Sequence, residues 1–397
     1  MFYFLKLAAG NIVKNRRNTF TIALVVAVCV FFMEFMAGYM DGFKDKIAND
    51  TLERSGHITV YNREYYNSLD FMPLDYNIEI TEELINGLKG HSNVTGVREE
   101  INFGGVLNSE YDNIDVMVKA INIQNENPLY ESRKRAVTEG RFIENPGEFV
   151  IGFKAARLLG VERGDSVILL TMDQYGGMNA IEGVITGFFV SNMPSEDEGL
   201  LICALSDAQD LLGLEGRVTE IFLNIRDYEV LNSAHSEKRR KLIEKSTTAE
   251  TPEEREKFAA EADKKYPLKG AEKTAKELED VIPGYAAAVP WQEEQPAIRY
   301  ALEMLEPMTF AVSAILVFVA AMGITNSFLM NIMGRMPEFG VMRAMGLSTK
   351  QMFGMIVSES FLLGVIGTAA GMIPGVGLVY YFQKLSLIHI SEPTRPY

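Results

Sequence analysis

The chain has few of the residues from which catalytic and metal sites are built. Its 397 residues include two cysteines, Cys29 and Cys203, and four histidines scattered without ligand spacing. Two distant cysteines build no disulfide framework, and no CxxC pair or His/Cys cluster indicates zinc. The motifs G-x-x-x-x-G-K-[ST], G-x-S-x-G and H-E-x-x-H are missing as well. We therefore predict no catalytic residue, no cofactor site, no metal site and no enzymatic activity on this chain.

Positive charge is also scarce. Lysine and arginine together number 38, against 53 aspartates and glutamates, which gives a net charge of -15. A protein that binds a polyanion needs a basic surface. The composition therefore argues against nucleic acid as a partner.

Long apolar runs, by contrast, lie near both ends of the chain. They occupy residues 19–40, 307–333 and 352–382. A helix of ~20 apolar residues crosses the ~30 Å hydrocarbon layer of a bilayer. We predict a transmembrane helix in each run, with a buried core helix as the alternative. The first run is too long for a signal peptide, and no A-x-A-like site follows it, so we interpret it as a retained anchor.

The basic residues beside these runs predict their orientation. Four lie in residues 1–18, before the first run, and three lie in the loop 334–351 between the second and third runs. Short flanks that carry Lys and Arg stay on the cytoplasmic side. Both segments are therefore predicted to be cytoplasmic, which places residues 41–306 outside the cytoplasm.

Three glycines and two acids stand out within the apolar runs. Gly367, Gly371 and Gly375 recur every four residues and share one helix stripe, where another helix can approach closely. Glycines merely tolerated in lipid are the alternative. Acids within a span are costly unless they reach a partner or the interface. We expect Glu34 to contact water near the outer surface, and the intramembrane acid Glu359 to make a structural hydrogen bond rather than relay protons.

The middle of the chain predicts a large α+β domain. Segments 56–62 and 115–122 are rich in β-branched and apolar residues, which is typical of strands. The stretch 147–171 indicates strand, helix, turn and strand. In its helix, Ala155, Leu158 and Leu159 are predicted to form the apolar face.

A charged segment, 231–280, then follows. It is dense in Lys, Glu and Ala, which predicts a solvated helical insertion, with a partner-binding arm as the alternative. Trp291, the only tryptophan, is predicted to be a packing residue. The helix that follows it is expected to lead directly into the second apolar run.

The loop 334–351 is short and polar, yet it has the signals of a helix of its own. Pro337 suits the first helical position, where its missing N–H costs nothing, and Gly346 can end the helix in a left-handed conformation. The apolar residues at helical spacing between them are Phe339, Met342 and Met345. We predict a helix of two to three turns whose apolar face lies in a groove of another protein. A helix resting on lipid headgroups is the alternative.

The residues after this helix predict how the third run begins. Ser348 is followed three residues later by Gln351, which fits the capping-box pattern.

This loop also carries a family resemblance. "RMPEFGVMRAMGLSTKQM" resembles the segment between the second and third spans of the MacB/LolC/LolE/FtsX permeases, which reads R-x-x-E-F/I-G-x-x-R-A-x-G. "ESFLLGVIGTAAG" resembles their third span, and "LKLAAGNIVKNRRNTFTIALVVAV" resembles their N-terminal helix and first span. "VIGFKAARLLGVERGDSVIL" and "AVPWQEEQPAIRYALEML" resemble their external domain, of MacB periplasmic-core type. The resemblance covers nearly the whole chain.

The resemblance implies a mechanotransmission (type VII) ABC permease of the bacterial inner membrane. It implies a cytoplasmic amphipathic helix over 1–18, a cytoplasmic ATPase dimer that carries ATP and Mg on a separate chain, and a second permease subunit, identical or different. The partners further include membrane lipid and a periplasmic carrier or adaptor. The ATPase-coupling residues implied by position are Arg335, Glu338, Phe339, Gly340, Met342, Arg343 and Gly346. Of these, Arg343 and Glu338 would pair with charges on the ATPase, and Phe339 and Met342 would fill its groove.

Two departures from the family pattern affect this interpretation. No fourth span follows Phe382, and the last residues resemble the translation of a sequencing adapter, so we interpret 385–397 as a non-native tail of a truncated gene. The MacB type carries its ATPase on the same chain and this chain does not, which favours the LolC/LolE-like branch and hence lipoprotein release. The alternatives are a MacB-like permease for efflux or peptide export and an FtsX-like regulator of cell-wall hydrolases.

Overall fold

The computed structural model describes residues 10, 16–69, 72–124, 133–191, 193–226, 233–249, 251–265 and 267–389. These residues fall into two compact units. A helical unit takes the described residues up to Ile47 and those from Tyr300 onward, and a mixed unit extends from Ala48 to Arg299. The N-terminal helix predicted over 1–18 lies largely outside the described residues, as does the part of the predicted tail after His389.

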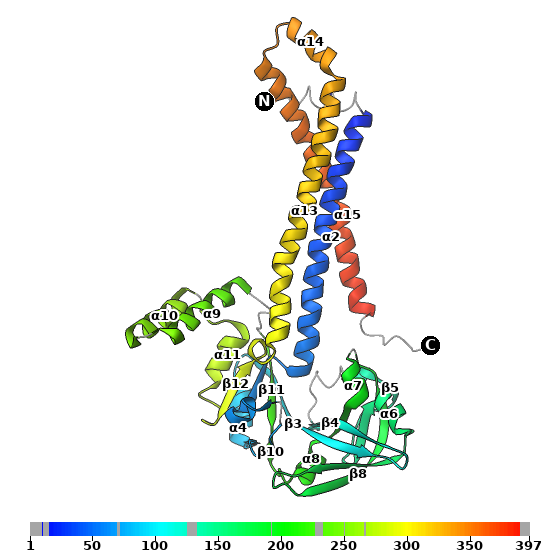
Figure 1. Ribbon diagram of the computed structural model, residues 1–397, viewed down its shortest axis with the longest axis vertical. Helices are drawn as coiled ribbons and strands as arrows, with labels where there is room; N and C mark the ends of the chain where they lie inside the picture. Colours follow the sequence, from blue (N-terminus) through cyan, green and yellow to red (C-terminus); the bar gives the residue numbers. More distant parts are fainter. Residues whose placement is uncertain are drawn as a thin grey trace. The chain divides into compact units, whose positions relative to one another are not determined.

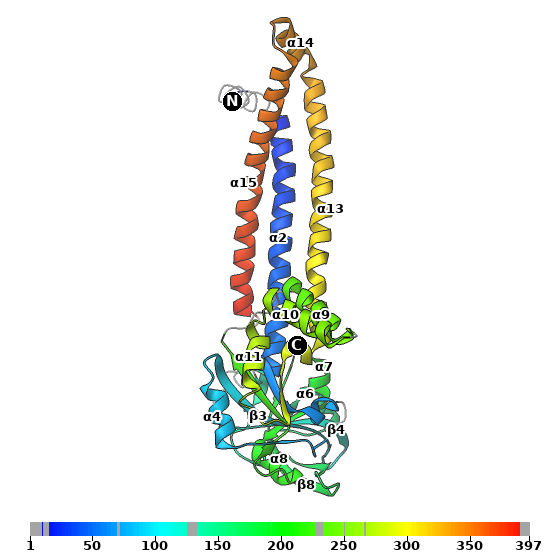
Figure 2. The same cartoon turned by 90° about the vertical axis from the view of Figure 1, so that its left-hand side faces the viewer.

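The helical unit contains three long apolar helices and one short helix. The long helices are α2 (Arg16–Ser55), α13 (Pro296–Gly334) and α15 (Thr349–His389), and the short helix is α14 (Met336–Ala344) (Figure 1). The segments long and apolar enough to cross a membrane are Thr19–Ala48, Pro296–Gly334 and Thr349–Phe382. At ~1.5 Å per residue, each exceeds the ~30 Å of a bilayer core. In Figure 2, α2 runs between α15 and α13 over most of its length.

The mixed unit is built on a ten-stranded sheet, in the order β12-β1-β11-β3-β4-β9-β6-β8-β5, with β7 paired to β3 and β8. Its strands are β1 (Ile58–Asn62), β3 (Val94–Asn108), β4 (Asn113–Ile121), β5 (Val137–Gly140), β6 (Glu148–Gly152), β7 (Ser166–Met172), β8 (Met178–Phe189), β9 (Leu200–Ala204), β11 (Glu220–Ile225) and β12 (Ala286–Pro290). The pairs β4–β9 and β6–β8 are parallel, whereas the other pairs are antiparallel. A second, two-stranded sheet pairs β2 (Ile78–Glu79) with β10 (Arg217–Val218). The α+β class and the strands predicted over 56–62 and 115–122 are confirmed.

The mixed unit also contains short helices. They are α3 (Arg63–Tyr66), α4 (Glu82–Gly90), α6 (Phe153–Leu159), α7 (Pro194–Gly199), α8 (Leu205–Leu212), α9 (Ser233–Thr248), α10 (Pro252–Lys265), α11 (Gly270–Leu278) and α12 (Trp291–Glu294).

The predicted strand, helix, turn and strand of residues 147–171 correspond to β6, α6 and β7, but the predicted helix face is partly wrong. Ala155 and Leu159 are buried as expected, whereas Leu158 is 58% exposed and Ala156 takes its place in the core. Each residue turns a helix by ~100°, so the buried stripe that contains 155 and 159 passes through 156 and leaves 158 outside. Gly160 ends the helix in the left-handed region, with φ +66°.

The prediction that the whole charged segment 231–280 is solvated is wrong for its last helix. Helices α9 and α10 pack on each other, but α11 lies on β12. Its buried residues are Ala271, Thr274, Ala275 and Leu278. These positions follow the i, i+3, i+4, i+7 spacing of a core-facing helix, and the abundance of small residues hid that spacing in the sequence.

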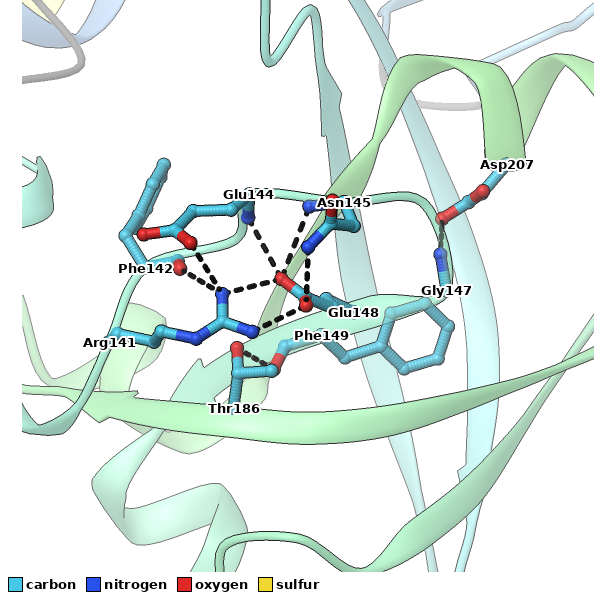
Figure 3. A network of polar contacts seen from close by, with 9 residues as sticks. All are labelled: Arg141, Phe142, Glu144, Asn145, Gly147, Glu148, Phe149, Thr186 and Asp207. Carbon is cyan, nitrogen blue, oxygen red and sulfur yellow. Dashed lines mark hydrogen bonds and ion pairs between the residues drawn. The ribbon is translucent and has the colours of Figure 1, made fainter.

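One carboxylate holds the loop between β5 and β6. Glu148 accepts hydrogen bonds from the backbone N–H groups of Glu144 (2.8 Å) and Asn145 (3.2 Å) and from Nη1 of Arg141 (2.7 Å) (Figure 3). The Arg141 guanidinium lowers the pKa of Glu148 to about 2. The backbone N–H of Gly147 donates to Asp207 on α8 at 2.7 Å, which attaches the same loop to the neighbouring helix.

Candidate functional site

The loop between the second and third apolar helices contains the predicted short helix. Pro337 lies in the first turn of α14. After the helix, Gly346 adopts φ +95°, and its N–H donates to the carbonyl of Arg343 at 3.1 Å. The backbone N–H of Leu347 donates to the carbonyl of Met342 at the same distance. These bonds satisfy the last helical carbonyls, so the predicted end of the helix at Gly346 is confirmed.

The predicted capping box at the start of α15 is also confirmed. The Ser348 N–H donates to Oε1 of Gln351 at 2.9 Å, and the Gln351 N–H donates back to Oγ of Ser348 at 3.4 Å. This reciprocal pair satisfies two N–H groups that a helix start leaves open. The loop 334–351 therefore has defined local structure on both sides of Gly346.

The apolar surface of α14 differs from the face that the sequence predicted. Phe339 and Met342 are half-buried, whereas Val341 and Met345 are 59% and 70% exposed. Val341 and Met345 are four residues apart, so they lie one above the other on one side of the helix. The sequence analysis missed Val341, although its spacing from Met345 was visible. Met336, at the start of α14, is exposed as well.

The charged residues predicted for this loop fall into two groups. Arg343 is exposed, and the Glu338 side chain is 43% exposed. Arg335 is only 7% exposed, and its Nη1 lies 2.9 Å and 3.0 Å from the two carboxylate oxygens of Glu359, which is 2% exposed. The structure thus joins two residues that the sequence treated separately. The sequence analysis expected Glu359 to make a structural hydrogen bond, and in the structure this contact is an ion pair with Arg335.

The predicted glycine stripe lies where α15 approaches α2. A Cβ built on Gly367 would lie 2.6 Å from Cβ of Val26, and one on Gly371 would overlap the carbonyl oxygen of Ala27. At Gly375 a Cβ would lie 3.1 Å from Cβ of Glu34. Since a side chain at either of the first two positions would push the helices apart, their small size permits the close approach.

In the mixed unit, charged side chains that the sequence analysis did not single out gather on one face of the sheet. Arg98 and Glu100 on β3 are fully buried, with Nε of Arg98 2.9 Å from Oε1 of Glu100. Nη1 of Arg133 lies 3.6 Å from the same oxygen. Arg98, Glu100 and Asn102 occupy every second position and so share one face of the strand. The charged Glu99 between them obscured that pattern in the sequence.

Glu220 on β11 belongs to this cluster, because the register pairs it with Glu100. It accepts hydrogen bonds from Nδ2 of Asn102 at 2.7 Å and from the hydroxyl of Tyr65 at 3.3 Å. Burial raises the pKa of Glu220 to about 7.

Residues on the same face of the sheet bind α12, the short helix that leads into α13. Glu294 on α12 accepts hydrogen bonds from the hydroxyls of Thr59 (2.8 Å) and Tyr61 (3.0 Å), both on β1. Trp291 is fully buried, as predicted, and its backbone N–H donates to the carbonyl of His57 at 3.1 Å. β1 follows α2 and β12 precedes α12, and the two strands pair directly. The chain segments that lead out of α2 and into α13 are therefore joined in one piece of sheet.

The chain is similar to ABC transporter permeases. Its residues 310–396 match the FtsX-like permease C-terminal family. It is 20% identical over 381 residues to the lipoprotein-releasing system transmembrane protein LolC of Xylella fastidiosa, covering 92% of this chain and 76% of LolC. It is 22% identical over 251 residues to the uncharacterized ABC transporter permease Rv0987 of Mycobacterium tuberculosis, covering 63% of this chain. The chain spans only 24% of that relative's length.

Two solved extracytoplasmic domains also resemble part of the chain. The extracellular domain of the transporter YknZ from Gram-positive bacteria has 14% identity and a TM-score of 0.32, covering 58% of this chain and 98% of that one. The periplasmic region of MacB from Actinobacillus actinomycetemcomitans has 14% identity and a TM-score of 0.29, covering 48% and 83%.

The apolar helices and the mixed sheet domain define a membrane protein with an extracytoplasmic domain. Within that class, the chain is most simply described as similar to the ABC transporter permeases of the MacB/LolC/FtsX type. The relatives reported above are described as permeases, which are not enzymes themselves.

Proposed function

We propose that this chain is the permease subunit of an ABC transporter that acts in lipoprotein release from the bacterial inner membrane. A separate cytoplasmic ATPase dimer, which carries ATP and Mg, would drive movement of residues 41–306 on the outer side. A second permease subunit, identical or different, would complete the complex. The similarity to LolC, which extends over 92% of this chain, supports the choice of cargo.

The observation that carries this proposal is α14. It is a short helix with its own start and end, placed between two helices that are long and apolar enough to cross a membrane. Its exposed side chains include Val341 and Met345 together with the cation Arg343. Apolar side chains at helical spacing are suited to a hydrophobic groove on a partner protein. A basic side chain beside them is suited to an acidic group at the rim of that groove.

The link between membrane and sheet supports movement of the external domain. Residues Ala48–Ser55 of α2 lead through Gly56 into β1, and β12 leads through α12 into α13. Because β1 and β12 pair along their length, from Ile58–Pro290 to Asn62–Ala286, a shift of either helix would be passed to the same part of the sheet. No cofactor is proposed on this chain, and ATP would be hydrolysed by the partner.

The experiment is to copurify the cognate ATPase with this protein in lipid nanodiscs and to measure association and ATPase rate. Val341→Asp combined with Met345→Asp should abolish association, because two charges would enter an apolar groove. Glu338→Ala with Arg343→Ala should weaken it. Leu158→Asp is the matched control, since Leu158 is an equally exposed apolar side chain on α6 of the mixed unit.

Association and stimulation at wild-type levels in the Val341/Met345 double variant would show that α14 is not the ATPase-binding helix. The cargo is tested separately, by depleting the protein in its own cells and following lipoprotein sorting. Unchanged sorting would leave the permease assignment in place and remove lipoproteins as the cargo.

A further inference from the structure

Arg335 connects two helices that the chain itself joins only through α14 and a turn. It directly follows Gly334, the last residue of α13, whereas Glu359 lies 24 residues later on α15. One guanidinium nitrogen contacts both carboxylate oxygens, at 2.9 Å and 3.0 Å. Both side chains are covered by protein, with 7% and 2% exposure. The ion pair therefore joins the two ends of the segment 335–359.

Further contacts fix the direction of the Arg335 side chain. Its Nε lies 3.2 Å from Oε2 of Glu338, and its guanidinium carbon lies 5.5 Å from the centre of the Phe339 ring. Both partners belong to the first turn of α14. A planar guanidinium held by two carboxylates and an aromatic face has one favourable orientation, which a lysine would not reproduce.

Glycines flank α14 on both sides, Gly334 before and Gly346 after. A Cβ built on either glycine meets nothing within 4 Å, so both positions have open space around them. Gly346 already has φ +95°, a region that few other residues adopt. Both ends of α14 are therefore positions at which the chain can bend.

We propose that the Arg335–Glu359 ion pair is a brace that holds α14 at a fixed angle and ties the end of α13 to α15. Arg335 and Glu359 are positioning residues, and neither is presented to a partner. A force applied to α14 would then move both membrane helices together instead of bending the loop at Gly346. That a partner ATPase applies this force rests on the proposed function. The brace itself is a property of this chain alone.

Electrostatics explain why the ion pair holds α14 when both charges are present and fails when either residue is replaced. A carboxylate within an apolar helix is unfavourable unless it is paired. A charge-assisted contact of one guanidinium nitrogen with both carboxylate oxygens supplies that pairing. Removing Arg335 takes this partner from the buried Glu359 carboxylate, and removing Glu359 leaves the buried Arg335 with only the partly exposed Glu338, so the segment then opens to hydrate the buried charge.

The test uses two exposed trypsin sites, Arg343 and Lys350, which lie on either side of Gly346. The full chain in nanodiscs, without any ATPase, is digested briefly and the fragments are identified by mass. Cleavage at a structured site requires local opening, so its rate reports how firmly α14 is held. Glu359→Gln should be cut at Arg343 at least about tenfold faster than wild type, as expected when a buried charge loses its partner.

Glu34→Gln is the matched control, because it removes another acid from an apolar helix without touching Arg335. Its cleavage rate should stay within about twofold of wild type, as for a substitution away from the probed segment. Arg335→Lys keeps the positive charge but loses the branched guanidinium that contacts Glu338 and Glu359 together. Its cleavage rate should lie between those of wild type and Glu359→Gln. The exchange of Arg335→Glu with Glu359→Arg should return the rate toward wild type.

Wild-type cleavage rates in both Glu359→Gln and Arg335→Lys would overturn the brace. The fluorescence of Trp291, the only tryptophan, shows whether each variant keeps the mixed unit folded. If Glu359→Gln does not fold, Arg335→Lys and the charge exchange decide the question in the same assay.

A second measurement adds the ATPase. In Glu359→Gln, the affinity for the ATPase should stay within about twofold of the wild-type value. The stimulation of the ATPase rate should fall about tenfold, a change of ~1.4 kcal/mol. Wild-type stimulation would overturn the transmission part of the proposal. Absence of any ATPase association by the wild-type protein would instead overturn the proposed function, and the trypsin result would remain valid.

Discussion

Gly371 of α15 lies against the backbone of Ala27 of α2, so closely that a methyl group on Gly371 would overlap the Ala27 carbonyl oxygen. One turn away, Gly367 lies against the Val26 side chain, and a Cβ there would lie 3.0 Å from the carbonyl oxygen of Ala23. The two helices therefore meet along backbone rather than along large side chains, as small residues permit in membranes.

This contact predicts that Gly371→Ala destabilises the helical unit by roughly 1–3 kcal/mol, because the added methyl forces the helices apart. Gly377→Ala on the same helix is the control, since a Cβ there meets nothing within 4 Å. The control should be neutral or slightly stabilising, because alanine favours helix. Thermal unfolding in detergent, followed by the loss of helical circular dichroism, measures both. Equal behaviour of the two variants would contradict the close approach of α15 to α2.

Glu148 predicts an acid-sensitive step in the stability of the mixed unit. The Arg141 guanidinium and backbone N–H groups lower its pKa to about 2, so the folded state binds this proton less readily than the unfolded chain. The stabilisation is complete above the ordinary glutamate pKa of ~4.5 and is lost as the pH falls toward about 2. Glu148→Gln should therefore lower the urea midpoint at pH 7 and reduce the further loss between pH 4.5 and 2.5.

Trp291 fluorescence follows this unfolding in the full chain, since the single tryptophan is buried in the mixed unit. Glu215→Gln, at an exposed position, is the control and should keep the wild-type pH profile. A Glu148→Gln profile parallel to wild type would show that the loop network in Figure 3 does not contribute to this stability.

Glu220 predicts a pH dependence of the opposite sign. Burial raises its pKa to about 7, so the folded state favours the protonated carboxyl. Its contribution is full below the unfolded pKa of ~4.5 and is lost as the pH rises through about 7. Glu220→Gln, which mimics the neutral form, should make stability fall less between pH 5 and pH 8, by on the order of 1 kcal/mol.

The groups that face Glu220 are Glu100, Lys119, Glu294 and Arg98, with hydrogen bonds from Asn102 and Tyr65. Melting temperatures at the two pH values, followed by Trp291 fluorescence, provide the measurement. If the melting temperature changed equally with pH in wild type and variant, the group that titrates would be another member of this cluster.

The burial of α11 predicts a contrast within the charged segment 231–280. Leu278→Ala should cost ~2–5 kcal/mol, because Leu278 is fully buried and its removal leaves a cavity. Ile243→Ala on α9 should change the free energy of unfolding by less than about 0.5 kcal/mol, because Ile243 is 37% exposed. Urea unfolding of both variants decides between a core helix and a solvated one. A small effect of Leu278→Ala would restore the original prediction for the whole segment.

The sequence by itself determined the features whose causes lie within a few residues of each other. The apolar runs predict helices that can cross a membrane because their composition alone determines whether lipid is a favourable solvent. The start and end of α14 follow from Pro337 and Gly346, and the start of α15 follows from the Ser348–Gln351 capping box. Each of these signals acts on its own backbone or on a neighbouring turn. The strand, helix and strand of residues 147–171 have the same local origin.

Only the tertiary structure decided which of these residues meet. Arg335 and Glu359 are 24 residues apart, and neither sequence position indicates that the first would be buried against the second. The cluster of Glu100 and Glu220 depends on the register between β3 and β11, which is set by the whole sheet. The exposed side of α14 depends on how it packs against its neighbours. Long-range pairing is a property of packing, which no local signal in the chain specifies.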